Sequence, residues 1–116
     1  MTAARSLKLT GELLRAYSRR GNFHSEPDEA RRIGLAGLVA QGMQVAGPAY
    51  GAALEAWGEA FLAHGVVDLK FVGMVTEDQT VDAVLDVDDD AAGATITVSN
   101  RDTGAVAVVG MLRRSG

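Results

Sequence analysis

A single histidine, His24, directly precedes residues that are typical of a helix start. Ser25 and Asp28 have the three-residue spacing of a capping box, and Pro27 suits an early helical position. Gly34 then suits the end of this short helix. An imidazole exchanges protons near neutral pH, and the free N–H groups of a helix N-terminus stabilise developing negative charge. This combination indicates acid–base chemistry on a carbonyl compound.

The run that begins at His24 reads HSEPDEARRIG and continues, a few residues later, as LVAQGM up to Met43. It resembles the signature of the MaoC-like acyl-thioester hydratases, Asp-x-Asn-Pro-Ile-His-x-Asp-Pro-x-x-Ala-x-x-x-Gly followed by Ile-Ala-His-Gly-Met. The matching residues are His24, Pro27, Ala30, Gly34, Ala40, Gly42 and Met43. A second run, FVGMVTEDQTV at 71–81, is similar to the family's Phe-x-x-Pro-Val-x-x-Gly-Asp-Thr-Leu. The likeness spans residues 7 to 112.

The resemblance implies roles for individual residues. His24 becomes the catalytic base, and the backbone N–H of Gly42, near the start of a long helix, becomes the donor to the thioester carbonyl oxygen. Asn22, Gln41 and Met43 are expected to contact the substrate, with Gln41 standing where the family has a second histidine. The alternative is structural: His24 caps a loop, and Gly42 only permits a tight entry into the helix.

The main departure from the family lies ahead of the histidine. The family has a catalytic Asp five residues before the His, and this chain has Arg19 there. A guanidinium stays protonated and cannot act as a general base. The preceding segment is also shorter than usual, so the Asp is either replaced or deleted. Glu26 and Asp28 are weaker substitutes, because Glu26 matches a non-catalytic acid of the motif and Asp28 suits capping.

Composition excludes several classes of function. The chain has 116 residues, enough for one domain at 1–116, with a net charge of −4 and no basic stripe, which argues against nucleic-acid binding. It has no cysteine, which fits a reducing compartment, and residues 1–6 lack the apolar core of a signal peptide, so we expect a cytoplasmic protein. Two histidines 40 residues apart do not make a metal site. We expect no metal and no cofactor.

One long segment predicts a buried helix from about Gly42 to Ala63. Apolar residues recur there at helical spacing, and small residues between them let a sheet approach closely. The recurring residues are Met43, Ala46, Tyr50, Leu54, Trp57 and Phe61. We expect Met43, Tyr50, Leu54 and Trp57 to be mostly buried. Residues 33–54 carry no charge, but glutamines, a proline and glycines argue against a membrane span.

The rest of the chain predicts strands. Residues 66–72, 80–87, 94–100 and 105–112 are rich in Val, Ile and Thr, and turn residues separate them, which favours an antiparallel meander. Asp88, Asp89 and Asp90 lack the spacing of a calcium loop and suit a hairpin turn. Leu7–Leu9 suits a short edge strand, and Thr10 suits the cap of a following helix. The class is α+β. The resemblance sharpens it to a hot-dog fold, a bent antiparallel sheet around a long central helix.

Three functions remain open at this point. The first is a lyase that hydrates a 2-enoyl thioester or dehydrates a 3-hydroxyacyl thioester. The second is a non-catalytic acyl-binding subunit of a heteromeric hydratase, and the third is a related isomerase or cyclase of a biosynthetic pathway. A single hot-dog leaves a sheet edge open. We therefore expect a homodimer or a heterodimer with another hot-dog subunit, with the site near the boundary. The residues do not distinguish acyl-CoA from acyl-carrier-protein substrates, or the acyl chain.

Overall fold

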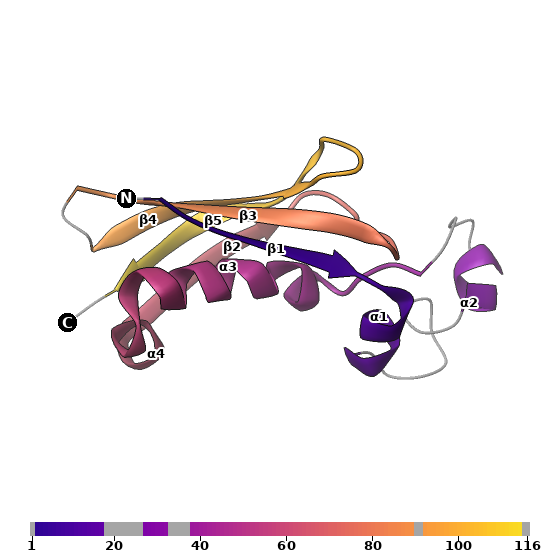
Figure 1. The fold of residues 1–116 in the computed structure, drawn as a ribbon, viewed down its shortest axis with the longest axis horizontal. Coiled ribbons are helices and arrows are strands. Elements are labelled where there is room, and N and C mark those ends of the chain that lie inside the picture. The colour runs from indigo at the N-terminus through magenta and orange to yellow at the C-terminus, as the bar shows by residue number, and fades with distance from the viewer. Residues whose placement is uncertain (1, 18–26, 33–37, 90–91, 115–116) are drawn as a thin grey trace.

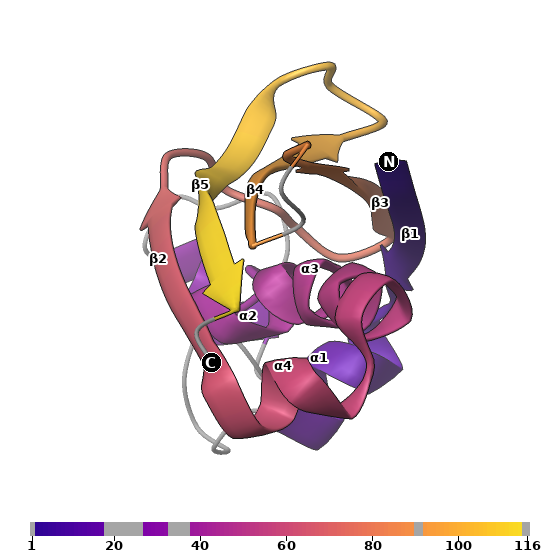
Figure 2. The ribbon, with the colours of Figure 1, turned by 90° about the vertical axis from the view of Figure 1, so that its left-hand side faces the viewer.

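A five-stranded antiparallel sheet curves over one long helix in the computed structural model (Figure 1). The structure describes residues 2–17, 27–32, 38–89 and 92–114. The strands are β1 (Thr2–Leu9), β2 (Gly65–Phe71), β3 (Gln79–Val87), β4 (Gly93–Asn100) and β5 (Val106–Arg114). Their order across the sheet is β1-β3-β4-β5-β2, so β1 and β2 are the two edges (Figure 2). The predicted α+β class with a bent sheet around a helix is confirmed.

The meander prediction holds for three strands and is wrong for β2. Strands β3, β4 and β5 follow one another as antiparallel neighbours, and the β3–β4 connection contains Asp88 and Asp89 as a turn. Strand β2 instead pairs with β5, at the far edge from β1. After β2 the chain crosses the end of the sheet before it enters β3. A short connection in the sequence does not distinguish this crossover from a hairpin.

The described residues form four helices, and Figure 1 shows the longest of them running beneath the sheet. They are α1 (Gly11–Tyr17), α2 (Pro27–Arg32), α3 (Gly42–Trp57) and α4 (Glu59–His64). Thr10 caps α1 as predicted, because its hydroxyl accepts a hydrogen bond of 3.2 Å from the N–H of Leu13. Pro27 is the first residue of α2, and Asp28 forms an ion pair with Arg31. Ser25 and Gly34 lie outside the described residues.

The central helix is shorter than predicted, because it breaks at Gly58. This residue has φ 60° and ψ −145°, a backbone conformation that a side chain disfavours. Its N–H donates to the carbonyl of Leu54 at 2.8 Å and closes α3, after which α4 starts in a new direction. Across the break, the rings of Trp57 and Phe61 stack with centroids 5.8 Å apart. The expected single helix to residue 63 is therefore two helices.

Small residues form the face of α3 that meets the sheet. Ala46, Ala49, Ala52 and Ala53 are fully buried there. Leu54 is 38% exposed, so its predicted burial is wrong, and Tyr50 and Trp57 are only half-buried. The alanines let the sheet come close, and the bulky side chains lie at the margins of the contact. The burial of Met43 falls outside what the structure describes.

The strands supply the bulk of the core that faces these alanines. Val81, Leu85, Ile96, Val98 and Leu112 are fully buried at alternate positions along β3, β4 and β5. This alternation is the period-two pattern of strands that bury one face. In the described part of the chain, none of the helices has the length and apolar character needed to cross a membrane.

Candidate active site at the start of the central helix

Gly42 is the first residue of α3, as the motif predicted. Gln41 before it is extended (φ −70°, ψ 147°), and its carbonyl accepts hydrogen bonds of 3.0 Å from Gln44 and 3.1 Å from Val45. No acceptor for the Gly42 N–H is found among the described residues. The positive end of the dipole of a 16-residue helix adds to this donor. Position 42 therefore offers a free N–H toward a developing negative charge.

A short antiparallel pairing fixes the chain just before Gly42. The N–H of Ala40 donates to the carbonyl of Val75 at 2.8 Å, and the N–H of Glu77 donates to the carbonyl of Leu38 at 2.8 Å. The Glu77 carboxylate also accepts from the N–H of Leu38 at 3.2 Å. The start of α3 is thereby held by the crossover that leads into β3.

Hydrogen bonds of the Gln79 and Asn100 side chains fix this crossover to the β4–β5 turn. The Oε1 atom of Gln79 accepts hydrogen bonds from the N–H of Thr76 at 2.9 Å and from the side-chain amide of Asn100 at 2.8 Å. Asn100 is 2% exposed, and its Oδ1 atom accepts from the N–H of Asp102 at 3.0 Å. A buried polar group must be satisfied in this way. Hydrogen bonds therefore connect the β4–β5 turn to the crossover, and the crossover to the start of α3.

Gln44 ties the first turn of α3 to α1. Its side-chain amide donates to the carbonyl of Leu13 at 2.9 Å. Its Oε1 atom is buried and has no hydrogen-bond partner among the described residues. The contact fixes the direction in which α3 leaves Gly42.

An apolar groove of about 390 Å³ opens beside Gly42. It lies between the start of α3 and the crossover after β2. Its lining residues are Val39, Ala40, Gly42, Val45, Phe71, Val72, Gly73, Met74 and Val75. None of these residues titrates, so this described part of the lining offers hydrophobic contact and the backbone N–H of Gly42. Any acid or base must come from outside this lining.

Phe71 is the side chain of the groove that lies against Gly42. A Cβ atom at position 42 would be 3.0 Å from two carbons of the Phe71 ring, so any side chain there would require this ring to shift. The ring is 49% exposed and borders the mouth of the groove. The sequence motif contained Phe71, but nothing in its spacing revealed the contact with residue 42.

Only part of the predicted site lies within the described structure. Gly42 lines the groove, and Gln41 directly precedes it and is partly exposed. His24, Asn22 and Arg19 lie outside the described residues, as does the side chain of Met43. Gln44, Gln79 and Asn100 position the site and were missed, because their partners are far away in the sequence.

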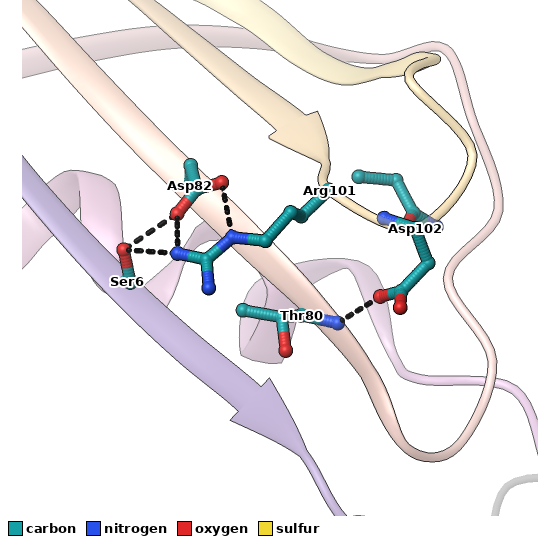
Figure 3. Close-up of polar contacts among 6 residues, drawn as sticks. Ser6, Thr80, Asp82, Arg101 and Asp102 are labelled. Atoms are coloured by element: carbon teal, nitrogen blue, oxygen red, sulfur yellow. Dashed lines mark hydrogen bonds and ion pairs between the residues drawn. The ribbon is translucent and has the colours of Figure 1, made fainter.

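The main electrostatic cluster of the described residues lies away from the groove, across β1 and β3 (Figure 3). Arg101 donates to both carboxylate oxygens of Asp82, at 3.0 Å and 2.5 Å, and Ser6 donates to Asp82 at 2.5 Å. The hydrogen bond from Arg101, followed by that from Ser6, lowers the pKa of Asp82 to about 2. The same contact raises the pKa of Arg101. This cluster holds the β4–β5 turn against β3 and β1. Among the described residues, no group of three metal-ligating side chains is found.

Comparison with known proteins finds the same fold in several solved structures. An (R)-hydratase from A. caviae involved in PHA biosynthesis aligns with a TM-score of 0.68 and 19% identity, over 99% of this chain and 95% of that one. A MaoC-like dehydratase from Phytophthora capsici gives a TM-score of 0.81 and 15% identity, over 97% of this chain and 41% of that one. The HadBC (3R-hydroxyacyl-ACP dehydratase) complex from Mycobacterium tuberculosis aligns with a TM-score of 0.68 and 19% identity, over 97% of this chain and 94% of that one.

At the level of sequence, neither a family model nor a curated protein matches the chain. The structural matches nevertheless establish the architecture. The chain has the hot-dog fold of MaoC-like dehydratases and (R)-hydratases, as the two sequence motifs predicted.

Proposed function

We propose that the groove beside Gly42 binds an acyl thioester and that the chain catalyses reversible hydration of its 2,3-double bond. The observation that carries this proposal is the free N–H of Gly42, which starts a long helix and opens on an apolar groove. A thioester has a carbonyl oxygen that accepts such a donor and an acyl chain that fills such a groove. The hydratase and dehydratase neighbours support the same reaction class.

The proposed reaction needs one base and one oxyanion donor. His24 takes a proton from water as the hydroxyl oxygen bonds to carbon 3 of the enoyl thioester. The electron pair of the double bond moves toward the thioester carbonyl, and the Gly42 N–H with the helix dipole stabilises the resulting enolate oxygen. His24 then returns its proton to carbon 2, and the product is a 3-hydroxyacyl thioester. Dehydration runs the same steps backwards.

A non-catalytic acyl-binding subunit is the second candidate. The observation in its favour is Arg19, which stands where the resembling family has its catalytic Asp. A guanidinium cannot accept the proton of water. In this alternative the groove and Gly42 shape the acyl pocket, and a partner subunit supplies the acid–base pair. The HadBC neighbour is itself a complex of hot-dog chains.

We further propose that the working form contains two hot-dog subunits in the cytoplasm. Among the described residues, no strand pairs with the outer side of β2. Its last residue, Phe71, lines the groove, so a subunit beside β2 would also border the site. A chain without cysteine suits a reducing compartment.

The decisive experiment follows the loss of enoyl-thioester absorbance with coenzyme A and carrier-protein substrates of increasing chain length. The variants are His24→Ala and, as a matched control, His64→Ala, which removes the other histidine at the end of α4. We expect His24→Ala to lower kcat by about 10² to 10⁴, the usual contribution of a general base, and His64→Ala to keep the rate.

Two results would overturn the catalytic proposal. Equal rates for wild type and His24→Ala would remove His24 from the mechanism. Activity that appears only with a second hot-dog chain, and that His24→Ala does not change, would establish the non-catalytic subunit.

A further inference from the structure

Met74 lies in the wall of the groove and is open to solvent. Its side chain lines the groove beside Gly42, and the residue is 58% exposed. The pattern that residues 71–81 resemble, Phe-x-x-Pro-Val, has proline at this position. The chain has no cysteine, so its sulfur chemistry belongs to its four methionines. An oxidisable thioether therefore stands where the resembling pattern has an inert ring.

We propose that Met74 is an oxidation site through which hydroperoxides regulate the groove, because its sulfoxide weakens the binding of acyl thioesters. The inference rests on the proposed function and adds a means of regulation to the same site. The Sδ atom of Met74 attacks one peroxide oxygen, and an S–O bond forms as the O–O bond breaks. Sulfur gives up two electrons. The proton of the transferred oxygen moves to the other oxygen, which leaves as water or as an alcohol.

The sulfoxide changes what position 74 presents to a ligand. A thioether is a soft, weak acceptor that suits an apolar wall, whereas a sulfoxide is polar and a strong acceptor. The neighbouring N–H groups of Val72 and Gly73 already donate to the carbonyl of Ala107. Beneath a bound acyl chain, the sulfoxide oxygen would either lack a donor or compete with the thioester for the N–H of Gly42. Both outcomes weaken binding, because a covered polar group without a hydrogen bond costs free energy.

Met111 provides the comparison within the same chain. It is also 58% exposed, so peroxide reaches both methionines equally well. Met111 lies on β5, on the face of the sheet opposite to the buried Leu112, with Asp68 and Arg113 beside it. The side chains of Met1 and Met43 lie outside the described part of the chain. Of the two described methionine side chains, the one at position 74 lines the groove.

The experiment measures ligand binding before and after oxidation. The ligand is octanoyl-pantetheine, a saturated thioester that cannot be hydrated and that contains the part common to coenzyme A and carrier-protein substrates. Titration calorimetry gives its Kd, and peptide mass spectrometry locates the sulfoxides after treatment with hydrogen peroxide. We expect oxidation of the wild type to raise the Kd about tenfold. Treatment with methionine sulfoxide reductases is expected to restore the original Kd.

Matched variants separate Met74 from Met111. Leucine has similar volume without sulfur, so each leucine variant is compared with itself before and after oxidation. We expect the Kd of Met74→Leu to be insensitive to peroxide and the Kd of Met111→Leu to rise as in the wild type. Glutamine is a polar side chain of similar length. Met74→Gln should therefore bind weakly without peroxide, and Met111→Gln should bind like the wild type.

Several outcomes would overturn the proposal. They are an unchanged Kd in wild type whose Met74 is fully oxidised, a Met74 that resists peroxide while Met111 reacts, a rise in Kd that persists in Met74→Leu, or tight binding by Met74→Gln. A circular dichroism spectrum lost on oxidation would assign the effect to unfolding and overturn it too.

The proposed function and this inference fail in different ways. If the untreated wild type does not bind octanoyl-pantetheine, the proposed acyl groove is wrong, and the regulation falls with it. Tight binding that oxidation of Met74 leaves unchanged contradicts the regulation alone.

Discussion

The ring of Phe71 lies so close to the backbone of Gly42 that a Cβ atom there would sit 3.0 Å from two ring carbons. The backbone donor at this position can be removed by a proline, which also adds bulk against the ring. Proline suits the first position of a helix and has no N–H, and the extended Gln41 is compatible with a following proline. We expect Gly42→Pro to lower kcat for enoyl-thioester hydration by about 10² to 10³.

Gly42→Ala is the control for the added bulk. It introduces a Cβ atom but keeps the N–H, and the half-exposed Phe71 ring has space to turn aside. We expect this variant to lose only a few-fold in rate. Similar losses in both variants would show that steric change at Phe71, and not the donor, limits the reaction.

The low pKa of Asp82, about 2, predicts a contribution to stability that depends on pH. The unfolded carboxyl has a pKa of about 3.9, so the folded state binds this proton less readily. The contribution is therefore complete above about pH 4 and is lost as the pH falls toward 2. We expect Asp82→Asn to lower the melting temperature modestly at pH 7, because the pair is exposed, and by less at pH 2.

Asp89→Asn serves as the comparison for this pH series. Asp89 is exposed in the β3–β4 turn and contacts no partner in the described structure. Its substitution should shift the melting temperature little at any pH. A constant difference between wild type and Asp82→Asn from pH 7 to pH 2 would contradict the linkage.

Asp78 has φ 66°, the left-handed conformation that favours glycine. The MaoC-like pattern that this segment resembles has glycine at the matching position. We expect Asp78→Gly to stabilise the fold by about 0.5 kcal/mol, which raises the melting temperature by roughly 2–4 °C, and Asp78→Ala to destabilise it. Calorimetry would measure the melting temperatures of both variants. An Asp78→Ala variant more stable than wild type would contradict backbone strain at this position.

Substitution of Asn100 tests how much the hydrogen bonds between the crossover and the β4–β5 turn contribute to stability. In Asn100→Ala, Gln79 loses its buried donor and the N–H of Asp102 loses its acceptor. Unsatisfied buried groups of this kind lower the free energy of unfolding by about 1–3 kcal/mol. Ser99→Ala, one residue earlier in β4, should change it by less than about 0.5 kcal/mol. Urea unfolding compares the free energies of unfolding of the two variants. Equal losses would show that the Asn100 hydrogen bonds make no special contribution.

Local patterns predicted the elements well, because strand-forming residues, turn residues and capping residues act within a few positions. The strands, the Thr10 cap and the start of α3 at Gly42 all depend on such short-range signals. The place of β2 beside β5 does not, since it depends on a pairing across about 40 residues. Gly58 illustrates another limit: a glycine within a helical pattern is usually tolerated, and only its observed φ of 60° marks the break.

In the candidate site too, local sequence signals were predictive and contacts between distant segments were not. The motif located Gly42 from its neighbours in sequence. The contact with Phe71 and the brace through Gln79 and Asn100 join distant segments, so spacing alone did not reveal them. The predicted burial of Leu54 was wrong, because the prediction assumed that the bulky apolar residues of the helix face the core. The sheet lies so close to α3 that small residues occupy the contact instead.

The alanine face of α3 also limits how the proposed acyl groove could be enlarged in evolution. Ala46, Ala49, Ala52 and Ala53 already have the smallest side chain that retains a Cβ atom, so truncation there frees almost no volume. The residues that line the groove with larger side chains are Val45 on the helix and Phe71, Val72 and Met74 at the end of β2 and in the crossover. If the proposed function is right, selection for longer acyl chains should leave its substitutions at these positions while the four alanines stay constant.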